Sequence, residues 1–98
     1  MSKYLVDIDL PHQFTDEFVS LIPTQKAHVN RLLGEGVLDS YTLAMDRSKL
    51  WATVPAGSEE EVMDVLATMP LMKYMRVNIY ELAFHETAYS GLVHVSLN

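Results

Sequence analysis

The fold is decided by one stretch of the chain, TMPLMKYMRVNIYEL at residues 68–82. A helical pattern ends in front of Pro70, because the residue before a proline is biased away from the helical conformation. A short apolar segment follows, and residues 76–85 then alternate in the way that is typical of a β-strand. The stretch therefore predicts the passage from a second helix to the last strand of a small α+β domain.

Toward the N-terminus, the first strand and the first helix have clear signals. Residues 3–10 alternate with period two and predict a strand that ends at Pro11. Thr15 is a favourable N-cap for a helix that would run to the glycines at positions 34 and 36. Pro23 lies inside this helical pattern and should kink the helix or divide it, because proline lacks the N–H of an interior helical hydrogen bond.

Between this helix and the opening stretch, two more strands and the second helix are expected. Residues 37–45 and 49–54 are rich in β-forming residues, and residues 46–48 between them predict a tight hairpin. Ser58 is the expected N-cap of the second helix, with Glu61 completing a capping box. The resulting order is β-α-β-β-α-β, the ferredoxin-like arrangement, in which an antiparallel sheet carries both helices on one face.

The domain is expected to span residues 1–85, and residues 86–98 would form a C-terminal extension with a short strand at 92–97 that contacts a partner subunit. The alternation leaves one sheet face without a covering layer. The residues expected there are Leu5, Asp7, Asp9, Asn78, Tyr80, Leu82 and Phe84, together with Tyr41, Leu43 and Trp51. Such a face is too apolar to remain in water, so two sheets packed face to face would form a dimeric α+β barrel around an elongated cavity. The alternative is that residues 86–98 fold back over their own sheet.

Composition limits the classes of function. The 98 residues suffice for one domain, and 49% apolar with 20% charged residues indicates a folded globule. A net charge of −6 argues against nucleic-acid binding. Absence of cysteine excludes disulfides and zinc–sulfur sites, and Asp7 and Asp9 interrupt the N-terminal apolar run, which argues against a signal peptide or membrane span. A soluble, cytoplasmic protein is expected.

Residues 69–75, MPLMKYM, resemble a Leu-Pro-Leu-Phe-Pro-Tyr-Met segment of the muconolactone isomerase family, where it joins the last helix to the last core strand. RLLGEGVL at 31–38 is similar to the family's Arg-Leu-x-x-Glu-Gly, and His85 stands where the family tends to have a histidine. The resemblance implies a ferredoxin-like fold, dimers or larger homo-oligomers, and a role in the catabolism of aromatic compounds. It also implies cofactor-independent isomerisation, in which a proton shift moves a double bond within an unsaturated lactone.

One motif of the family is incomplete in this chain. Family members tend to carry an acid-Lys-acid pattern on the first helix, in line with Gln25, Lys26 and Ala27. The lysine is kept and both acids are absent. If one of those acids is the base in the family, this chain cannot perform the reaction in the same way.

A proton shift needs a base that is active near neutral pH and donors that stabilise an enolate oxygen. The candidate catalytic residues are His85, His28 and Asp7, because imidazole titrates near neutrality and a pocket can raise a carboxyl pKa. The candidate substrate-binding residues are Tyr80, Asn78, Gln25, Lys26, Trp51 and Tyr41. Each has a structural alternative: His28 as a boundary histidine, Asp7 as an inward charge that deters aggregation, and the aromatic residues as core.

The four histidines, at positions 12, 28, 85 and 94, do not have a metal-ligand spacing, so neither a metal nor another cofactor is predicted. The leading hypothesis is a homodimeric or larger isomerase-like protein that binds a small, mostly apolar organic acid or lactone between its sheets. The expected partners are a second copy and a small molecule, not nucleic acid or a membrane. Two alternatives stay open, a non-catalytic ligand-binding or oligomerisation module and a dimeric-barrel monooxygenase, for which Trp51 and Asn78 are the candidate residues.

Overall fold

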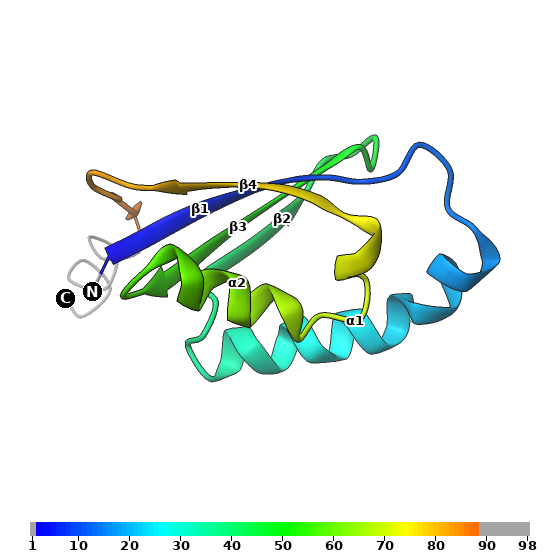
Figure 1. The fold of residues 1–98 in the computed structure, drawn as a ribbon, viewed down its shortest axis with the longest axis horizontal. Helices are drawn as coiled ribbons and strands as arrows, with labels where there is room; N and C mark the ends of the chain where they lie inside the picture. Colours follow the sequence, from blue (N-terminus) through cyan, green and yellow to red (C-terminus); the bar gives the residue numbers. More distant parts are fainter. Residues whose placement is uncertain (1, 89–98) are drawn as a thin grey trace, which may run out of the picture.

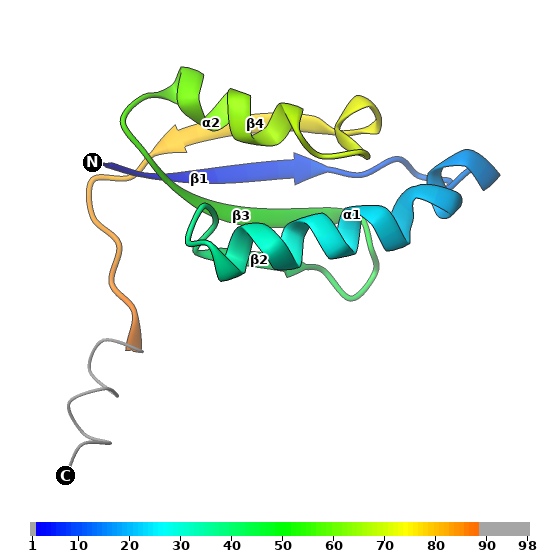
Figure 2. The same cartoon turned by 90° about the horizontal axis from the view of Figure 1, so that it is seen from below.

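The computed structural model describes residues 2–88, which form a four-stranded antiparallel sheet with two helices (Figure 1). The elements are β1 (Ser2–Asp9), α1 (Asp16–Gly34), β2 (Ser40–Leu43), β3 (Lys49–Ala56), α2 (Glu59–Ala67), the short 3₁₀ helix η1 (Met72–Tyr74) and β4 (Arg76–Glu81). The strands lie in the order β2-β3-β1-β4. Both helices cover the same face of the sheet (Figures 1 and 2), which confirms the ferredoxin-like fold.

The central strand β1 has the predicted alternation. Tyr4, Val6 and Ile8 are buried beneath the helices, and their neighbours on β3 are Val54, Ala52 and Leu50 in the antiparallel register. Side chains of directly opposed residues lie on the same face of a sheet, so these six form the centre of the core. Leu5, Asp7 and Asp9 therefore lie on the opposite face, which we call the open face.

The first helix begins where its N-cap was expected, since the Thr15 hydroxyl accepts a hydrogen bond of 3.2 Å from the Phe18 N–H. Of the two outcomes predicted for Pro23, division of the helix is wrong, because α1 is continuous from Asp16 to Gly34. Buried Phe18 and Gln25 lie on either side of the proline. Their packing against the sheet outweighs the loss of one backbone hydrogen bond.

The second helix is capped in a variant of the predicted capping box. The Ser58 hydroxyl accepts from the Glu61 N–H at 3.2 Å, as expected, but the Glu61 carboxylate accepts from the Gly57 N–H at 2.6 Å. In a capping box the glutamate would accept from the N–H of Ser58 itself, so the donor is here one residue earlier. A Cβ at position 57 would lie 3.2 Å from the Glu61 carboxylate, so glycine permits this close approach.

Several predicted boundaries differ from the structure for identifiable reasons. β2 begins at Ser40, because the N–H groups of residues 37 and 38 bond to the Leu32 carbonyl at the end of α1. β4 ends at Glu81 and not at residue 85. One further bond joins the Leu82 N–H to the Lys3 carbonyl, after which β1 has almost no residues left to pair. His85 therefore lies beyond the strand.

The β2–β3 connection also corrects the sequence prediction. It spans residues 44–48, longer than the expected tight turn, and β3 continues through Pro55 to Ala56. Tyr41 and Leu43 were expected on the open face, but they pair with Ala52 and Leu50 and therefore lie on the helix-covered face. Trp51 pairs with Asp7 and does lie on the open face.

The predicted strand at residues 92–97 and most of the extension at 86–98 lie outside the described residues. Sheet-to-sheet pairing of two copies stays a prediction. Between residues 2 and 88, no helix has the length and apolar character needed to cross a membrane.

Candidate functional site

A pocket of about 560 Å³ lies on the helix-covered side of the sheet, between α1, the β2–β3 hairpin and the segment before β4. Its volume is within the range of small-molecule sites. Apolar side chains form most of its wall, namely Leu10, Phe14, Phe18, Ile22, Val29, Leu33, Leu43, Leu50, Leu71 and Met75. Its polar lining residues are Gln25, Lys26, Asn30, Tyr41 and Arg47. Three of the predicted substrate-binding residues, Gln25, Lys26 and Tyr41, are thus brought together.

Gln25 ties three segments together at the wall of this pocket. Its side chain is only 4% exposed, and its Nε2 donates to the Tyr41 hydroxyl oxygen at 3.2 Å while its Oε1 accepts from the Leu71 N–H at 3.0 Å. The amide therefore connects α1 with β2 and with the segment after α2. Because a buried backbone N–H needs a partner, Gln25 has a structural role at this position.

The same hydrogen bond orients Tyr41 for donation. The hydroxyl oxygen accepts from Gln25, so its own proton remains available for a group in the pocket. Burial raises the pKa of Tyr41 above its ordinary value, although the Gln25 hydrogen bond acts in the opposite direction. The hydroxyl is therefore protonated at neutral pH and can donate to an oxygen atom of a ligand.

The charged groups in the pocket wall are cations. The Lys26 side chain makes no hydrogen bond or ion pair with any residue between 2 and 88, and the Arg47 guanidinium donates only to the Met45 carbonyl, at 3.3 Å. No carboxylate or imidazole is among the lining residues in the described part of the chain. The pocket is therefore locally positive in a chain whose net charge is −6.

The open face brings together the other predicted ligand contacts. The register places Asp7 between Asn78 on β4 and Trp51 on β3, in one row across the sheet. Tyr80 lies one row further along, opposite Leu5, and is 52% exposed. These four residues share a face as predicted, and the sheet separates them from the pocket.

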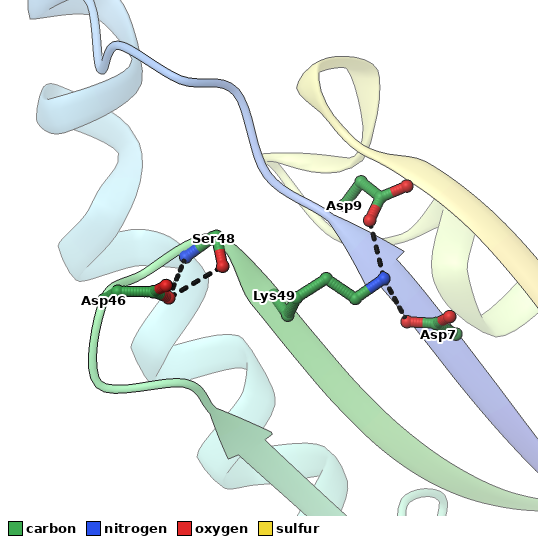
Figure 3. A network of polar contacts seen from close by, with 5 residues as sticks. All are labelled: Asp7, Asp9, Asp46, Ser48 and Lys49. Atoms are coloured by element: carbon green, nitrogen blue, oxygen red, sulfur yellow. Dashed lines mark hydrogen bonds and ion pairs between the residues drawn. The ribbon is translucent and has the colours of Figure 1, made fainter.

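Lys49 lies between the two carboxylates of this face (Figure 3). Its Nζ atom is 2.7 Å from Asp7 Oδ1 and 2.7 Å from Asp9 Oδ1. The hydrogen bonds to Asp7 and Asp9 raise the pKa of Lys49, and the bond from Lys49 lowers the pKa of Asp9. Asp7 Oδ1 is buried, and its one partner among the described residues is this ammonium group.

The three predicted catalytic residues lie in three different places. His28 bridges the helices, with Nε2 2.7 Å from Thr68 Oγ1 and Nδ1 3.0 Å from an Arg31 guanidinium nitrogen. The Thr68 hydroxyl donates to the Val65 carbonyl, so it accepts from His28 Nε2–H, and Nδ1 accepts from Arg31. His85 is exposed beyond the end of β4, and Asp7 lies on the open face. None of the three lines the pocket, and their catalytic roles stay predictions.

Arg47 is the functional candidate that sequence reasoning missed. In the sequence, Asp46, Arg47 and Ser48 have the character of a turn and nothing more. Only the closure of the hairpin over α1 brings the Arg47 side chain to the pocket. In the described part of the chain, no group of three or more His, Asp or Glu side chains is placed to hold a metal ion.

Comparison with known proteins identifies the family. The family model of muconolactone delta-isomerase matches residues 3–88. The chain belongs to this family. The structure also matches a 3.3 Å crystal structure of muconolactone isomerase with a TM-score of 0.69 and 22% sequence identity, covering 87% of this chain and 92% of that one. At this identity the structural match shows a shared fold. No curated protein matches the chain.

Membership of the muconolactone delta-isomerase family draws attention to the position of Gln25. The sequence resemblance predicts that family members carry an acid at this position, and the structure shows that Gln25 lines the pocket. Here an amide fills the position, and both of its polar atoms are already bonded to Tyr41 and Leu71. This family member therefore lacks an ionisable group at that point of the pocket wall.

Proposed function

We propose that the chain is a cofactor-independent isomerase that moves a proton between carbon atoms of a small unsaturated lactone or organic acid. Family membership supports the reaction class. The observation that carries the proposal is the pocket, because it combines apolar walls with a protonated hydroxyl and two cations that have no acid partner among residues 2–88. These features match a ligand with an apolar body and anionic or developing negative charge.

Some pocket residues would bind the ligand, and others would stabilise the negative charge that develops during the reaction. Lys26 and Arg47 attract a carboxylate of the ligand, and the apolar wall contacts its carbon skeleton. The Tyr41 hydroxyl donates to the oxygen on which negative charge develops when a carbon loses its proton. Gln25 holds that hydroxyl in place through its 3.2 Å bond.

The base must come from outside the residues that line the pocket in this single copy. We infer that His85 supplies it to the site of a partner subunit in a homodimer, because His85 is exposed and adjoins the extension expected to contact the partner. His28 is engaged between Arg31 and Thr68, and Asp7 is paired with Lys49. These engagements make both less available for proton transfer than His85.

Incubation with muconolactone, followed by the change in ultraviolet absorbance, tests this function. We expect turnover that falls about 100-fold or more in His85→Ala, as loss of a general base does. Tyr41→Phe should lower kcat by about tenfold or more with a smaller effect on KM, because an oxyanion donor is lost. Glu86→Ala is the matched control, since Glu86 is the exposed neighbour of His85 and lies outside the pocket wall. Turnover that is unchanged in both His85→Ala and Tyr41→Phe would contradict these assignments.

A second candidate is a non-catalytic protein that binds the same class of ligand. The observation in its favour is Gln25, an amide whose nitrogen and oxygen each already have a hydrogen-bond partner, at the position where the resemblance places an acid. Calorimetric binding of muconolactone without any absorbance change would favour this binding function. Binding accompanied by turnover would exclude it.

A further inference from the structure

A second cleft, of about 840 Å³, adjoins the pocket at the β2–β3 hairpin. It is more polar and is lined by Asp9, Pro11, His12, Asp46, Ser48, Lys49, Tyr74 and Arg76, in addition to three residues that it shares with the pocket. The shared residues are Leu10, Phe14 and Arg47. Arg47 is therefore the charged residue at the boundary between an apolar compartment and a polar one.

The backbone of Arg47 is in an unfavourable conformation for this residue type. Its φ of 62° makes it the one non-glycine residue with a positive φ in the described part of the chain. A residue with a Cβ pays about 1–2 kcal/mol for this left-handed conformation, whereas glycine and asparagine adopt it more readily. A strained arginine at a turn is a reason to ask what its side chain does.

The hairpin itself does not require the Arg47 side chain. The Asp46 carboxylate accepts from the Ser48 N–H at 3.0 Å and from the Ser48 hydroxyl at 2.7 Å (Figure 3). The Arg47 N–H donates to the Ala44 carbonyl at 2.9 Å. Backbone and Asp46 bonds thus close the turn, and glycine or asparagine would serve equally well at position 47.

The Arg47 guanidinium also has no carboxylate partner in the described part of the chain. Lys3, Lys49 and Lys73 each form an ion pair with an aspartate or glutamate. The neighbouring Asp46 is engaged with Ser48, and its pKa is lowered by those bonds. Within residues 2–88, the guanidinium has only the 3.3 Å bond to the Met45 carbonyl, so most of its donors are available.

We propose that Arg47 is the specificity-determining residue of the site, and that it holds the carboxylate of the ligand at the boundary between the two compartments. The apolar body of the ligand lies in the pocket, where Leu10 and Phe14 adjoin the same boundary. The planar guanidinium binds the two carboxylate oxygens with parallel hydrogen bonds. This role rests on the proposed function, and it makes the site select organic anions over neutral molecules of the same shape.

Calorimetric titration of the full chain with phenylacetate and with neutral phenylacetamide tests this role. The measured quantity is the ratio of the two Kd values, in which general changes in the pocket cancel. We expect the wild type to bind the acid about tenfold or more tightly than the amide, as a charge-assisted bidentate contact provides. In Arg47→Asn the ratio should fall to about one or two, while Arg47→Lys should retain part of the preference.

Controls separate this role from folding and from general charge. Asparagine accepts the left-handed backbone, so the Tm of Arg47→Asn should equal or exceed that of the wild type. Arg31→Gln removes an arginine that lines neither cavity and should leave the ratio unchanged. If Arg47→Asn keeps the preference, or if Lys26→Gln alone abolishes it, Arg47 does not hold the carboxylate, although the pocket still binds ligand. If the wild type binds neither probe, the pocket is not a ligand site and the proposed function fails with it.

Discussion

The two faces of strand β1 differ sharply although their residues alternate along one chain segment. On the covered face, Val6 and Ile8 are completely buried beneath the helices. On the open face, Asp7 and Asp9 share the ammonium group of Lys49 (Figure 3). The covered face also borders the pocket, which has cations but no carboxylate in its described wall. The same strand thus separates a core and a pocket with cationic wall residues from a face on which two carboxylates share one ammonium group.

The largest expected difference between the faces is in packing. Ile8→Ala should lower the free energy of unfolding by about 3 kcal/mol, because it creates a cavity in the core, whereas Leu5→Ala on the open face should cost less than about 1 kcal/mol. Urea unfolding monitored by circular dichroism measures both values. If Leu5→Ala costs as much as Ile8→Ala and the wild-type midpoint rises with protein concentration, a second copy covers the open face in solution.

The next effect concerns the buried amide of Gln25 on the covered face. Gln25→Leu should lower the free energy of unfolding by about 2 kcal/mol, since the Leu71 N–H and the Tyr41 hydroxyl each lose a partner. Asn30→Leu on the same helix is the matched control, because the Asn30 side chain is exposed and makes no hydrogen bond with a described residue. Its cost should stay within about 0.5 kcal/mol. Equal costs for the two variants would mean that the Gln25 bonds add nothing to stability.

The smallest effect is electrostatic and belongs to the open face. Lys49 lowers the pKa of Asp9 in the folded state, so the pair stabilises the fold above the ordinary carboxyl pKa, and this contribution is lost as pH falls through the lowered value. Lys49→Gln should therefore be less stable than the wild type at neutral pH, and the difference should vanish in acid. The effect should be smaller than that of Gln25→Leu, because water and salt screen an exposed pair.

Unfolding midpoints measured across this pH range, at low and high salt, check the expectation. Lys26→Gln is the control, since Lys26 has no acid partner among the described residues and its difference from the wild type should stay constant across the same range. A Lys49→Gln difference that persists unchanged in acid would show that Lys49 stabilises the sheet by packing rather than by charge.

Prediction from the sequence succeeded where the signal is local. The caps at Thr15 and Ser58 and the boundary at Pro70 depend on residues a few positions apart, and the structure has elements that begin and end near them. At Pro23 the expectation of a divided helix failed, because buried residues on both sides of the proline keep α1 continuous. Prediction also failed at Tyr41, because the face that a short strand presents depends on its register with β3.

The candidate site was predictable only in part for the same reason. Gln25, Lys26 and Tyr41 were selected singly. Asp7, Asn78 and Tyr80 were correctly placed on one face, because the alternation of the two neighbouring strands β1 and β4 decides that placement. His28 was expected near a cavity, yet its position depends on the packing of α1 against the end of α2. Helical periodicity determines which side of a helix a residue lies on, but not which neighbouring element packs against that side.

By itself, the sequence determined the order of the elements, the helix-covered residues of β1 and the family to suspect, because these follow from period-two alternation, capping residues and a local motif. The tertiary structure alone decided that Gln25 bonds to Tyr41 and Leu71, that Lys49 serves two aspartates, and that Arg47 stands between two cavities. The hydrogen bonds of Gln25 join residues 16 and 46 positions apart in the chain. The place of Arg47 depends on where the β2–β3 hairpin lies against the rest of the fold. Such contacts exist only after strand register and helix packing have been established.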